Sequence, residues 1–123
     1  MNRPLSSLAF LFAMLYVSLV AAQSSPEGVA LSTDEATAFI KGKNLTANRL
    51  AGGTPSLQFK DDGTMYGNNS GSSDTGKWKI EDGKLCMAWR TWEYEGCGKL
   101  MRVGKEVRHF FSDGTAIHLV FKP

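Results

Sequence analysis

The stretch that decides the fold is Gly76–Cys97, GKWKIEDGKLCMAWRTWEYEGC. Large apolar side chains alternate with polar ones on both sides of Asp82-Gly83, and Asp-Gly is a preferred sequence for a two-residue hairpin turn. Residues at equal distances from such a turn pair across the two strands, so Ile80 is expected opposite Leu85. One face of the hairpin is then apolar and is expected to form part of the core: Trp78, Ile80, Leu85, Met87 and Trp89.

Cys86 and Cys97 are the two cysteines of the chain. An even pair in a small exported domain indicates a disulfide. Closing this short loop constrains the unfolded chain and stabilises the fold by roughly 3 kcal/mol. The predicted register places Cys86 on the face away from the core, which we expect to be the less buried face.

Residues 1–22, MNRPLSSLAFLFAMLYVSLVAA, have the composition of a secretory signal peptide. A basic residue precedes the apolar run Leu8–Val20, and small residues lead to a cleavage site after Ala22. The run is shorter than the about 20 apolar residues that span a membrane, so we expect cleavage and no stable membrane anchor. The mature chain is predicted to begin with a flexible segment, residues 23–31. It continues as a single domain, residues 32–123, in the periplasm or outside the cell.

Charge limits the classes of partner. Without the signal peptide the chain has 13 basic and 12 acidic residues, and no run of like charge. Nucleic-acid binding needs a basic patch that neutralises phosphates, so this balance argues against a nucleic-acid partner. The remaining candidates for a partner are a small molecule, a glycan or an envelope protein. The sequence leaves the oligomeric state open.

One short helix and a series of strands are predicted. Ser32 and Glu35 have the spacing of a capping box, and Gly42 is placed to end the helix. From Leu45 onward the hydrophobic pattern alternates, and the polar segment Asn68–Thr75, NNSGSSDT, is expected to be a flexible loop. The predicted strands are Asn44–Leu50, Ser56–Lys60, Thr64–Gly67, Gly76–Ile80, Lys84–Arg90, Cys97–Val103, Glu106–Ser112 and Thr115–Lys122.

These strands predict a mainly β fold, an antiparallel meander of about eight short strands. Closure into a barrel removes the exposed edges of a sheet. We therefore expect a barrel-like domain, similar to lipocalins or avidins, with the N-terminal helix at one end. A barrel of about eight strands encloses either one small ligand or only side chains.

The segment between the two cysteines carries the residues most suited to binding. If the strand continues without a bulge, Arg90, Trp92 and Tyr94 all point outward on the cysteines' face. Rings on a loop stiffened by a disulfide can stack on a sugar or a partner at low entropic cost. We therefore predict these three residues as ligand-binding candidates. The alternative is a bulge that turns Trp92 inward, where it packs as a structural aromatic residue.

His109 and His118 are the two histidines of the chain, and a turn at Asp113-Gly114 sets them directly opposite each other. Two imidazoles could share a zinc or copper ion, but a metal site needs at least three protein ligands and the sequence places no other ligand nearby. The alternative is a pair of partly buried histidines packed near Phe111. Facing imidazoles resist double protonation, so stability is expected to fall below about pH 6.

Motifs for catalysis are missing from the sequence, including a serine elbow, a phosphate loop and a zincin helix. Asp61-Asp62 falls in a turn, and Glu93 and Glu95 fall at a hairpin tip, where solvated carboxylates are usual. We therefore predict no enzyme activity, no catalytic residue and no cofactor.

Three parts of the chain together resemble a known family. They are STDEATAFIKGKNL at Ser32–Leu45, FKDDGT at Phe59–Thr64, and the spacing Gly76-x-Trp78-x-Ile80-x-x-Gly83-x-Leu85-Cys86-x-x-Trp89 followed by Cys97. The combination resembles a group of small bacterial envelope proteins classed as a domain of unknown function. The resemblance implies a periplasmic or secreted protein of a Gram-negative bacterium with Cys86 paired to Cys97. It carries over no catalytic residue.

These features predict an exported, non-enzymatic binding module for a small amphipathic ligand or an envelope glycan. The ligand would bind at an open end of the barrel or on the loop of Trp92 and Tyr94. The alternative function is an inhibitor or accessory protein that inserts the loop Arg90–Glu95 into the cleft of an envelope enzyme.

Overall fold

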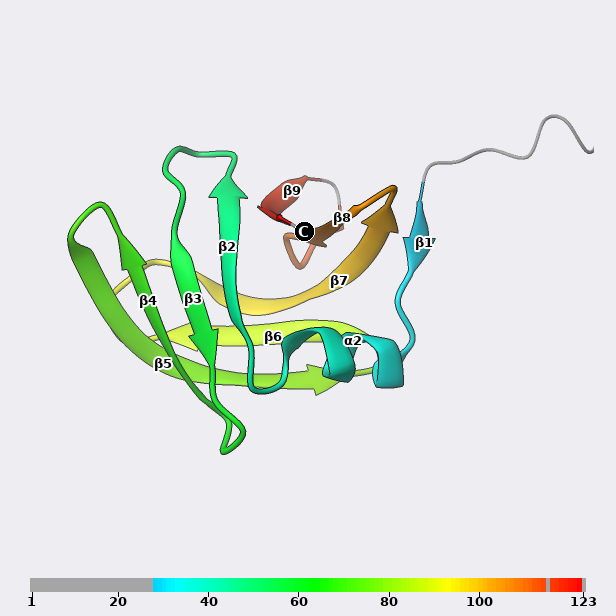
Figure 1. Cartoon of the computed structure of the whole chain (residues 1–123), viewed down its shortest axis with the longest axis horizontal. Helices are drawn as coiled ribbons and strands as arrows, with labels where there is room; N and C mark the ends of the chain where they lie inside the picture. Colours follow the sequence, from blue (N-terminus) through cyan, green and yellow to red (C-terminus); the bar gives the residue numbers. More distant parts are fainter. Residues whose placement is uncertain (1–27, 115, 123) are drawn as a thin grey trace, which may run out of the picture.

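The computed structural model describes residues 28–114 and 116–122, and the predicted signal peptide lies outside them. The described chain is a closed antiparallel barrel of eight strands with one extra strand and one short helix (Figure 1). Its elements are β1 (Val29–Ala30), α2 (Thr33–Ile40), β2 (Asn44–Arg49), β3 (Ser56–Phe59), β4 (Thr64–Asn69), β5 (Ser72–Glu81), β6 (Lys84–Trp89), β7 (Glu95–Val103), β8 (Glu106–Phe110) and β9 (Ile117–Phe121). The predicted barrel-like meander with a short helix is confirmed.

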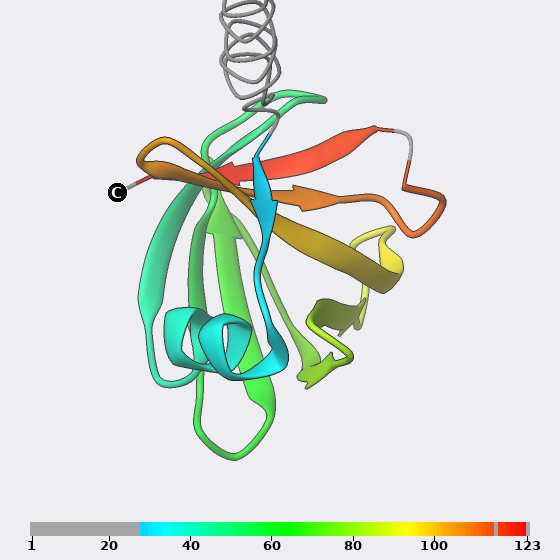
Figure 2. The same cartoon turned by 90° about the vertical axis from the view of Figure 1, so that its right-hand side faces the viewer.

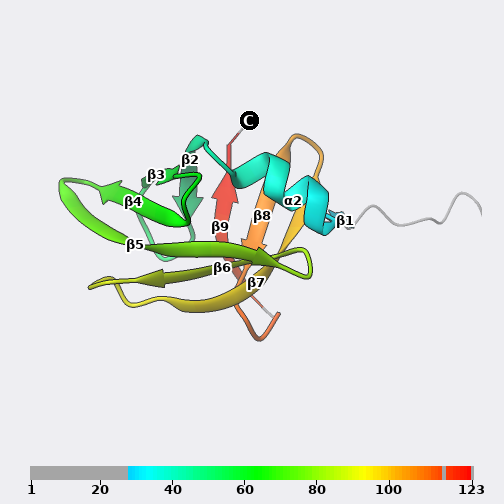
Figure 3. The ribbon, with the colours of Figure 1, turned by 90° about the horizontal axis from the view of Figure 1, so that it is seen from below.

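The barrel closes between its first and last strands. Each strand from β2 to β9 pairs with its neighbours along the chain, and β2 also pairs with β9, where Ala47 lies opposite Phe121. Seen from below, β5, β6 and β7 run side by side along one wall (Figure 3). Each barrel strand therefore has a partner on both sides, which removes the exposed edges of an open sheet.

The hairpin at Asp82 and Gly83 has the predicted register. Ile80 lies opposite Leu85, and the pairing continues in step along both strands. Asp82 and Gly83 have φ angles of 52° and 75°, as a type I′ turn requires. Leu85 is fully buried, so the predicted apolar face is the inner face of the wall.

The segment Asn68–Thr75, predicted to be a flexible loop, is instead a tight hairpin. β4 continues to Asn69 and β5 begins at Ser72, with Ser70 and Gly71 in the turn at φ angles of 54° and 87°. The ladder is made by backbone groups, so polar side chains leave it intact. The loop prediction is wrong because it equated polar composition with the absence of a strand.

β1 is the strand outside the barrel closure. It pairs with Met101 and Arg102 of β7. β6 pairs with β7 only as far as Lys99. Beyond that point the edge of β7 at Met101 and Arg102 has no partner from β6 and is open to β1. Residues 28–31, expected to belong to the flexible segment, are therefore held against the barrel.

α2 packs over the end of the barrel where the β5–β6 turn lies. Ser32 Oγ accepts a hydrogen bond from the Glu35 N–H at 3.1 Å, and Glu35 Oε1 accepts one from the Ser32 N–H at 2.9 Å, which is the predicted capping box. Ala36 and Ile40 are fully buried, so the helix closes this end. Among the described residues, no helix is long and apolar enough to cross a membrane.

Cys86 and Cys97 form the predicted disulfide from directly opposite positions on β6 and β7. Cys86 alternates with the core residues of β6 as predicted, yet it is only 6% exposed. The prediction of a less buried position is wrong at Cys86. The bonded sulfur of Cys97 covers it on one side, and a carboxylate oxygen of Glu81 lies 4.0 Å from its Sγ atom.

Candidate functional site

The end of the barrel away from α2 contains a cavity of about 500 Å³. In Figure 2 the β6–β7 loop and the β8–β9 turn lie together at this end, with α2 on the other side of the barrel. Apolar and aromatic side chains make up much of the cavity wall: Leu57, Trp89, Trp92, Tyr94, Phe111 and Leu119. The cavity is thus a concave, largely apolar site built from strand ends and from the loops that connect them.

Asp74 holds the β6–β7 loop in place. Its side chain is buried, and Oδ2 accepts hydrogen bonds from the backbone N–H groups of Thr91 and Trp92, each at 2.8 Å. Burial alone would raise the pKa of Asp74, but hydrogen bonds from Trp92, Thr91 and Thr75 outweigh it and lower the pKa. Sequence reasoning missed Asp74 because its segment was interpreted as a loop. Asp74 is the one acidic residue in the polar segment Asn68–Thr75, and this is the feature of the sequence that could have marked it as a hydrogen-bond acceptor.

Trp92 folds back onto the barrel. Its ring packs on Trp89 with 4.8 Å between centroids, and Nε1 donates to Ser72 Oγ at 3.3 Å. A Cβ atom on Gly67 of β4 would lie 2.7 Å from the Trp92 ring and 2.8 Å from the Trp89 ring, so both rings press against this glycine. The outward orientation predicted for Trp92 is wrong, because β6 ends at Trp89 and the loop turns the next ring inward.

Arg90 lies apart from the other two predicted binding residues. It is exposed, and its N–H donates to the carbonyl oxygen of Thr75 at 2.9 Å. Its side chain borders a shallow groove of about 780 Å³ on the outer face of the sheet, together with Tyr66 and Lys77. The structure therefore brings Trp92 and Tyr94 together at the cavity and leaves Arg90 outside it.

Tyr94 also faces the barrel, contrary to the outward orientation that was predicted. Its ring stacks on His118 at 4.1 Å with an interplanar angle of 11°, and it lies 5.8 Å from both His109 and Phe111. Its hydroxyl group is buried and forms no hydrogen bond of ordinary geometry within the described residues. Burial raises the pKa of Tyr94, and the nearby hydroxyl of Ser112 opposes the shift.

The two histidines meet through a β-bulge. Phe110 pairs with Ile117, but the register then shifts and His109 lies opposite Leu119. The predicted direct pairing of His109 with His118 is therefore wrong. The shift gives β9 two consecutive buried residues, His118 and Leu119, and it brings the Nδ1 atoms of the two histidines to 3.2 Å.

Hydrogen bonding determines the tautomer of each histidine. Nε2 of His109 lies 3.1 Å from the carbonyl oxygen of Leu85, which can only accept, so this nitrogen carries the proton. In the neutral ring Nδ1 of His109 is then an acceptor, and Nδ1 of His118 must donate to it. Nε2 of His118 is left without a proton.

Both histidines are neutral at pH 7. Burial and, secondly, the neighbouring His118 lower the pKa of His109 to about 3. Burial and, secondly, the positive charge of Arg49 lower the pKa of His118 to about 4. The pair is therefore a buried neutral contact, with His118 in the wall of the cavity and His109 behind it in the core, which agrees with the alternative of packed histidines.

Two side-chain groups resemble parts of a metal site. The 3.2 Å between Nδ1 of His109 and Nδ1 of His118 suits two ligands of one ion, but the described residues place no third histidine, cysteine or carboxylate beside them. Glu81, Cys86 and Cys97 also cluster, with ligand atoms within 4.8 Å of one another. The two sulfurs are bonded to each other, so no thiolate is available there.

Comparison with known proteins gives no match to a family model, to a curated protein or to a solved structure. The geometry of the cavity is therefore the basis for inferring function.

Proposed function

We propose that this protein is an exported, non-enzymatic binding module that holds one small amphipathic molecule in the open end of its barrel. The observation that carries the proposal is the cavity of about 500 Å³ lined by aromatic side chains. Sites for small ligands are typically concave and largely apolar, with volumes of about 300–1,000 Å³ and a few placed polar groups.

The cavity wall is fixed before any ligand arrives. Asp74 ties down the backbone of the β6–β7 loop, and the disulfide joins the two strands that this loop connects. A preorganised wall lowers the entropic cost of binding. Rigidity and apolar character together support a binding role.

Export is the second part of the proposal. The disulfide between Cys86 and Cys97 is compatible with an oxidising compartment such as the periplasm or the extracellular space. The segment that would direct export, residues 1–22, lies outside the described residues. Recovering the oxidised protein with Gln23 as its first residue from the periplasm or the medium would test this part.

Glycan binding is a second candidate, favoured by the outer groove. Tyr66 is 41% exposed there, beside the cationic side chains of Lys77 and Arg90. An exposed tyrosine ring can stack on a sugar. Cosedimentation with purified peptidoglycan, compared between the wild type and a Tyr66→Ala variant, tests this candidate.

The inhibitor alternative receives less support. It needs a loop that is free to enter the cleft of a target. In this chain Trp92 packs on Trp89, and its backbone is held by Asp74.

The cavity proposal is tested with a neutral apolar fluorophore, N-phenyl-1-naphthylamine, titrated into the mature chain. We expect saturable binding of one molecule with a Kd in the range of about 1–100 μM. A Trp92→Ala variant removes part of the wall and is expected to weaken binding about tenfold. The matched control, Tyr66→Ala, removes an aromatic ring outside the cavity and is expected to leave the Kd unchanged. No saturable binding, or equal loss in both variants, would refute the proposal.

A further inference from the structure

Arg49 and His118 bring two nitrogen-bearing side chains to one side of the cavity. Both residues line it, and they come from the adjacent strands β2 and β9. The ladder sets Arg49 opposite Leu119, and the Leu50 N–H donates to the carbonyl oxygen of His118 at 3.4 Å. The two side chains are therefore near neighbours in the same wall.

His118 offers one unpartnered nitrogen atom to this space. Its Nδ1 atom is bound to His109, and the two nitrogens of an imidazole point in different directions, so Nε2 faces away from that contact. Within the described residues Nε2 has no hydrogen-bond partner, although the side chain is only 8% exposed. Because Nε2 carries no proton in the neutral pair, its lone pair can accept a hydrogen bond or take up a proton when a ligand binds.

Arg49 supplies positive charge beside that nitrogen. Neither ion pair found within the described residues includes Arg49. Glu93 lines the same cavity, but Arg49 is the charged group that lowers the pKa of His118. The positive charge of Arg49 in this part of the wall therefore favours an anionic group.

We infer that the cavity selects an amphipathic carboxylic acid whose head group lies between the guanidinium group of Arg49 and Nε2 of His118. The inference rests on the proposed binding function and specifies its ligand class. A carboxyl oxygen accepts hydrogen bonds from the guanidinium group, and an Arg–carboxylate contact is one of the strong charge-assisted kinds. Nε2 of His118 takes up one proton from solvent as the carboxylate binds, and its N–H donates a hydrogen bond to the second oxygen, so the head group keeps its negative charge beside Arg49. The apolar part of the molecule packs against Trp89 and Trp92.

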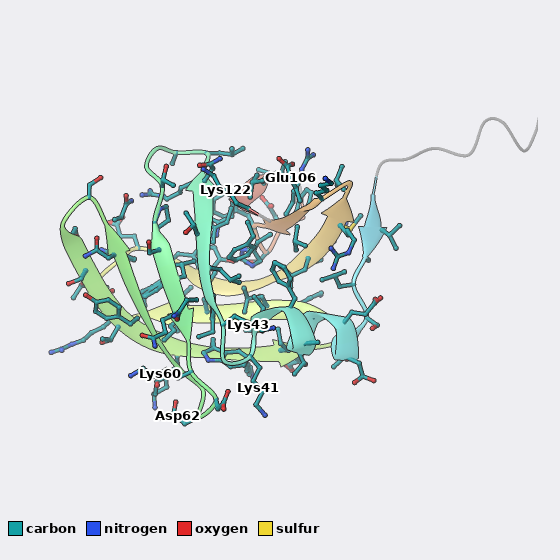
Figure 4. The ribbon with its side chains drawn as sticks, in the orientation of Figure 1. Lys41, Lys43, Lys60, Asp62, Glu106 and Lys122 are labelled. Atoms are coloured by element: carbon teal, nitrogen blue, oxygen red, sulfur yellow. A yellow bond between two sulfur atoms is a disulfide. The ribbon has the colours of Figure 1, made fainter. Side chains whose placement is uncertain are left out.

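Other cationic groups of the described chain do not create a second site of this kind. Lys41, Lys43 and Lys60 gather near the α2–β2 connection and the β3–β4 turn (Figure 4), and none of them lines the cavity. Arg90 lies in the outer groove. Arg49 is thus the cation that can select the charge of a ligand in the cavity.

The test compares octanoate with 1-octanol, which share a chain length and differ in the head group. Each competes with bound N-phenyl-1-naphthylamine on the mature chain at about pH 7. We expect octanoate to bind about tenfold more tightly than 1-octanol, or better. An Arg49→Gln variant is expected to remove this preference, because it weakens octanoate much more than 1-octanol. A His118→Phe variant keeps an apolar ring and is expected to weaken octanoate more than 1-octanol.

Arg90→Gln is the matched control, because it removes the same charge outside the cavity and is expected to keep the preference. Equal affinity for octanoate and 1-octanol, or a preference that survives Arg49→Gln, would overturn the inference and leave the binding function standing. Failure of the neutral fluorophore itself to bind would overturn the proposed function as well. The two failures are therefore distinguishable.

Discussion

The Nδ1 atoms of His109 and His118 lie 3.2 Å apart inside the barrel, although the two residues are not paired in the β8–β9 ladder. His109 is also hydrogen-bonded to Leu85 in the core, and His118 stacks on Tyr94 at the cavity. The neutral pair therefore connects the core to the cavity wall. Protonation of the pair is expected to affect the stability of the whole fold.

Stability is expected to decrease as the pH falls below about 6.5. In the folded chain the pKa of His109 is about 3 and that of His118 about 4, whereas both titrate near 6.5 when unfolded. The unfolded state therefore takes up protons first. Each histidine removes up to about 1.4 kcal/mol of stability per pH unit between its two pKa values. The full contribution is present above pH 6.5, and the loss continues to about pH 4 for His118 and about pH 3 for His109.

Urea denaturation at about pH 7.5, 6 and 5 measures this dependence in a range above the titration of most carboxylates. A His118→Phe variant is expected to show a shallower slope, and Arg90→Gln is expected to retain the slope of the wild type. A free energy of unfolding that stays constant from about pH 7.5 to pH 5 would contradict the prediction.

The sequence predicts the parts of this fold that local chemistry determines. Asp82-Gly83 sets its own hairpin register because a type I′ turn needs positive φ at both positions, and these two residues allow it. The capping box of Ser32 and Glu35 is equally local. Barrel closure can also be predicted from the pattern of strands and turns, because a long meander removes its exposed edges by closing.

The site depends on interactions that the local sequence does not contain. Trp92 turns inward because its N–H is bound by Asp74, which lies 18 residues earlier in the chain. The contact between His109 and His118 depends on a register shift, and counting outward from the turn assumes a regular ladder. The candidate residues Trp92 and Tyr94 were therefore predictable by type, while their orientation was not.

The disulfide is expected to be a major source of stability. Cys86 and Cys97 are 11 positions apart in the chain, and closing a loop of this length stabilises a fold by about 3 kcal/mol. A variant with alanine at both positions should lose this amount in chemical denaturation. The reduced wild type keeps both sulfur atoms and lacks the bond, so it should also lose about 3 kcal/mol relative to the oxidised protein. Identical stability of the oxidised and reduced wild type would show that the loop closure contributes nothing.

Gly67 is expected to tolerate no side chain while Trp92 is present. A Cβ atom there would lie 2.7 Å from the Trp92 ring, so Gly67→Ala should cost about 1–3 kcal/mol of stability through overpacking. In a Trp92→Ala background the cost should fall by about 1 kcal/mol, which a double-mutant cycle measures. Gly76→Ala is the control, because its Cβ would meet the carbonyl oxygen of Ala88 and removal of Trp92 cannot relieve that contact. Additive effects of the Gly67 and Trp92 substitutions would argue against the packing.

Asp74 is expected to control the shape of the cavity more than the stability of the barrel. Asp74→Ala frees the N–H groups of Thr91 and Trp92, so the loop should open and trypsin should cleave after Arg90 about tenfold faster. The same variant should bind N-phenyl-1-naphthylamine about tenfold more weakly, because the Trp92 wall is no longer held. Asp62→Ala is the matched control: Asp62 accepts hydrogen bonds from Thr64 in the β3–β4 turn, away from the cavity. Unchanged cleavage in Asp74→Ala, measured by mass after reduction of the disulfide, would mean that other contacts hold the loop.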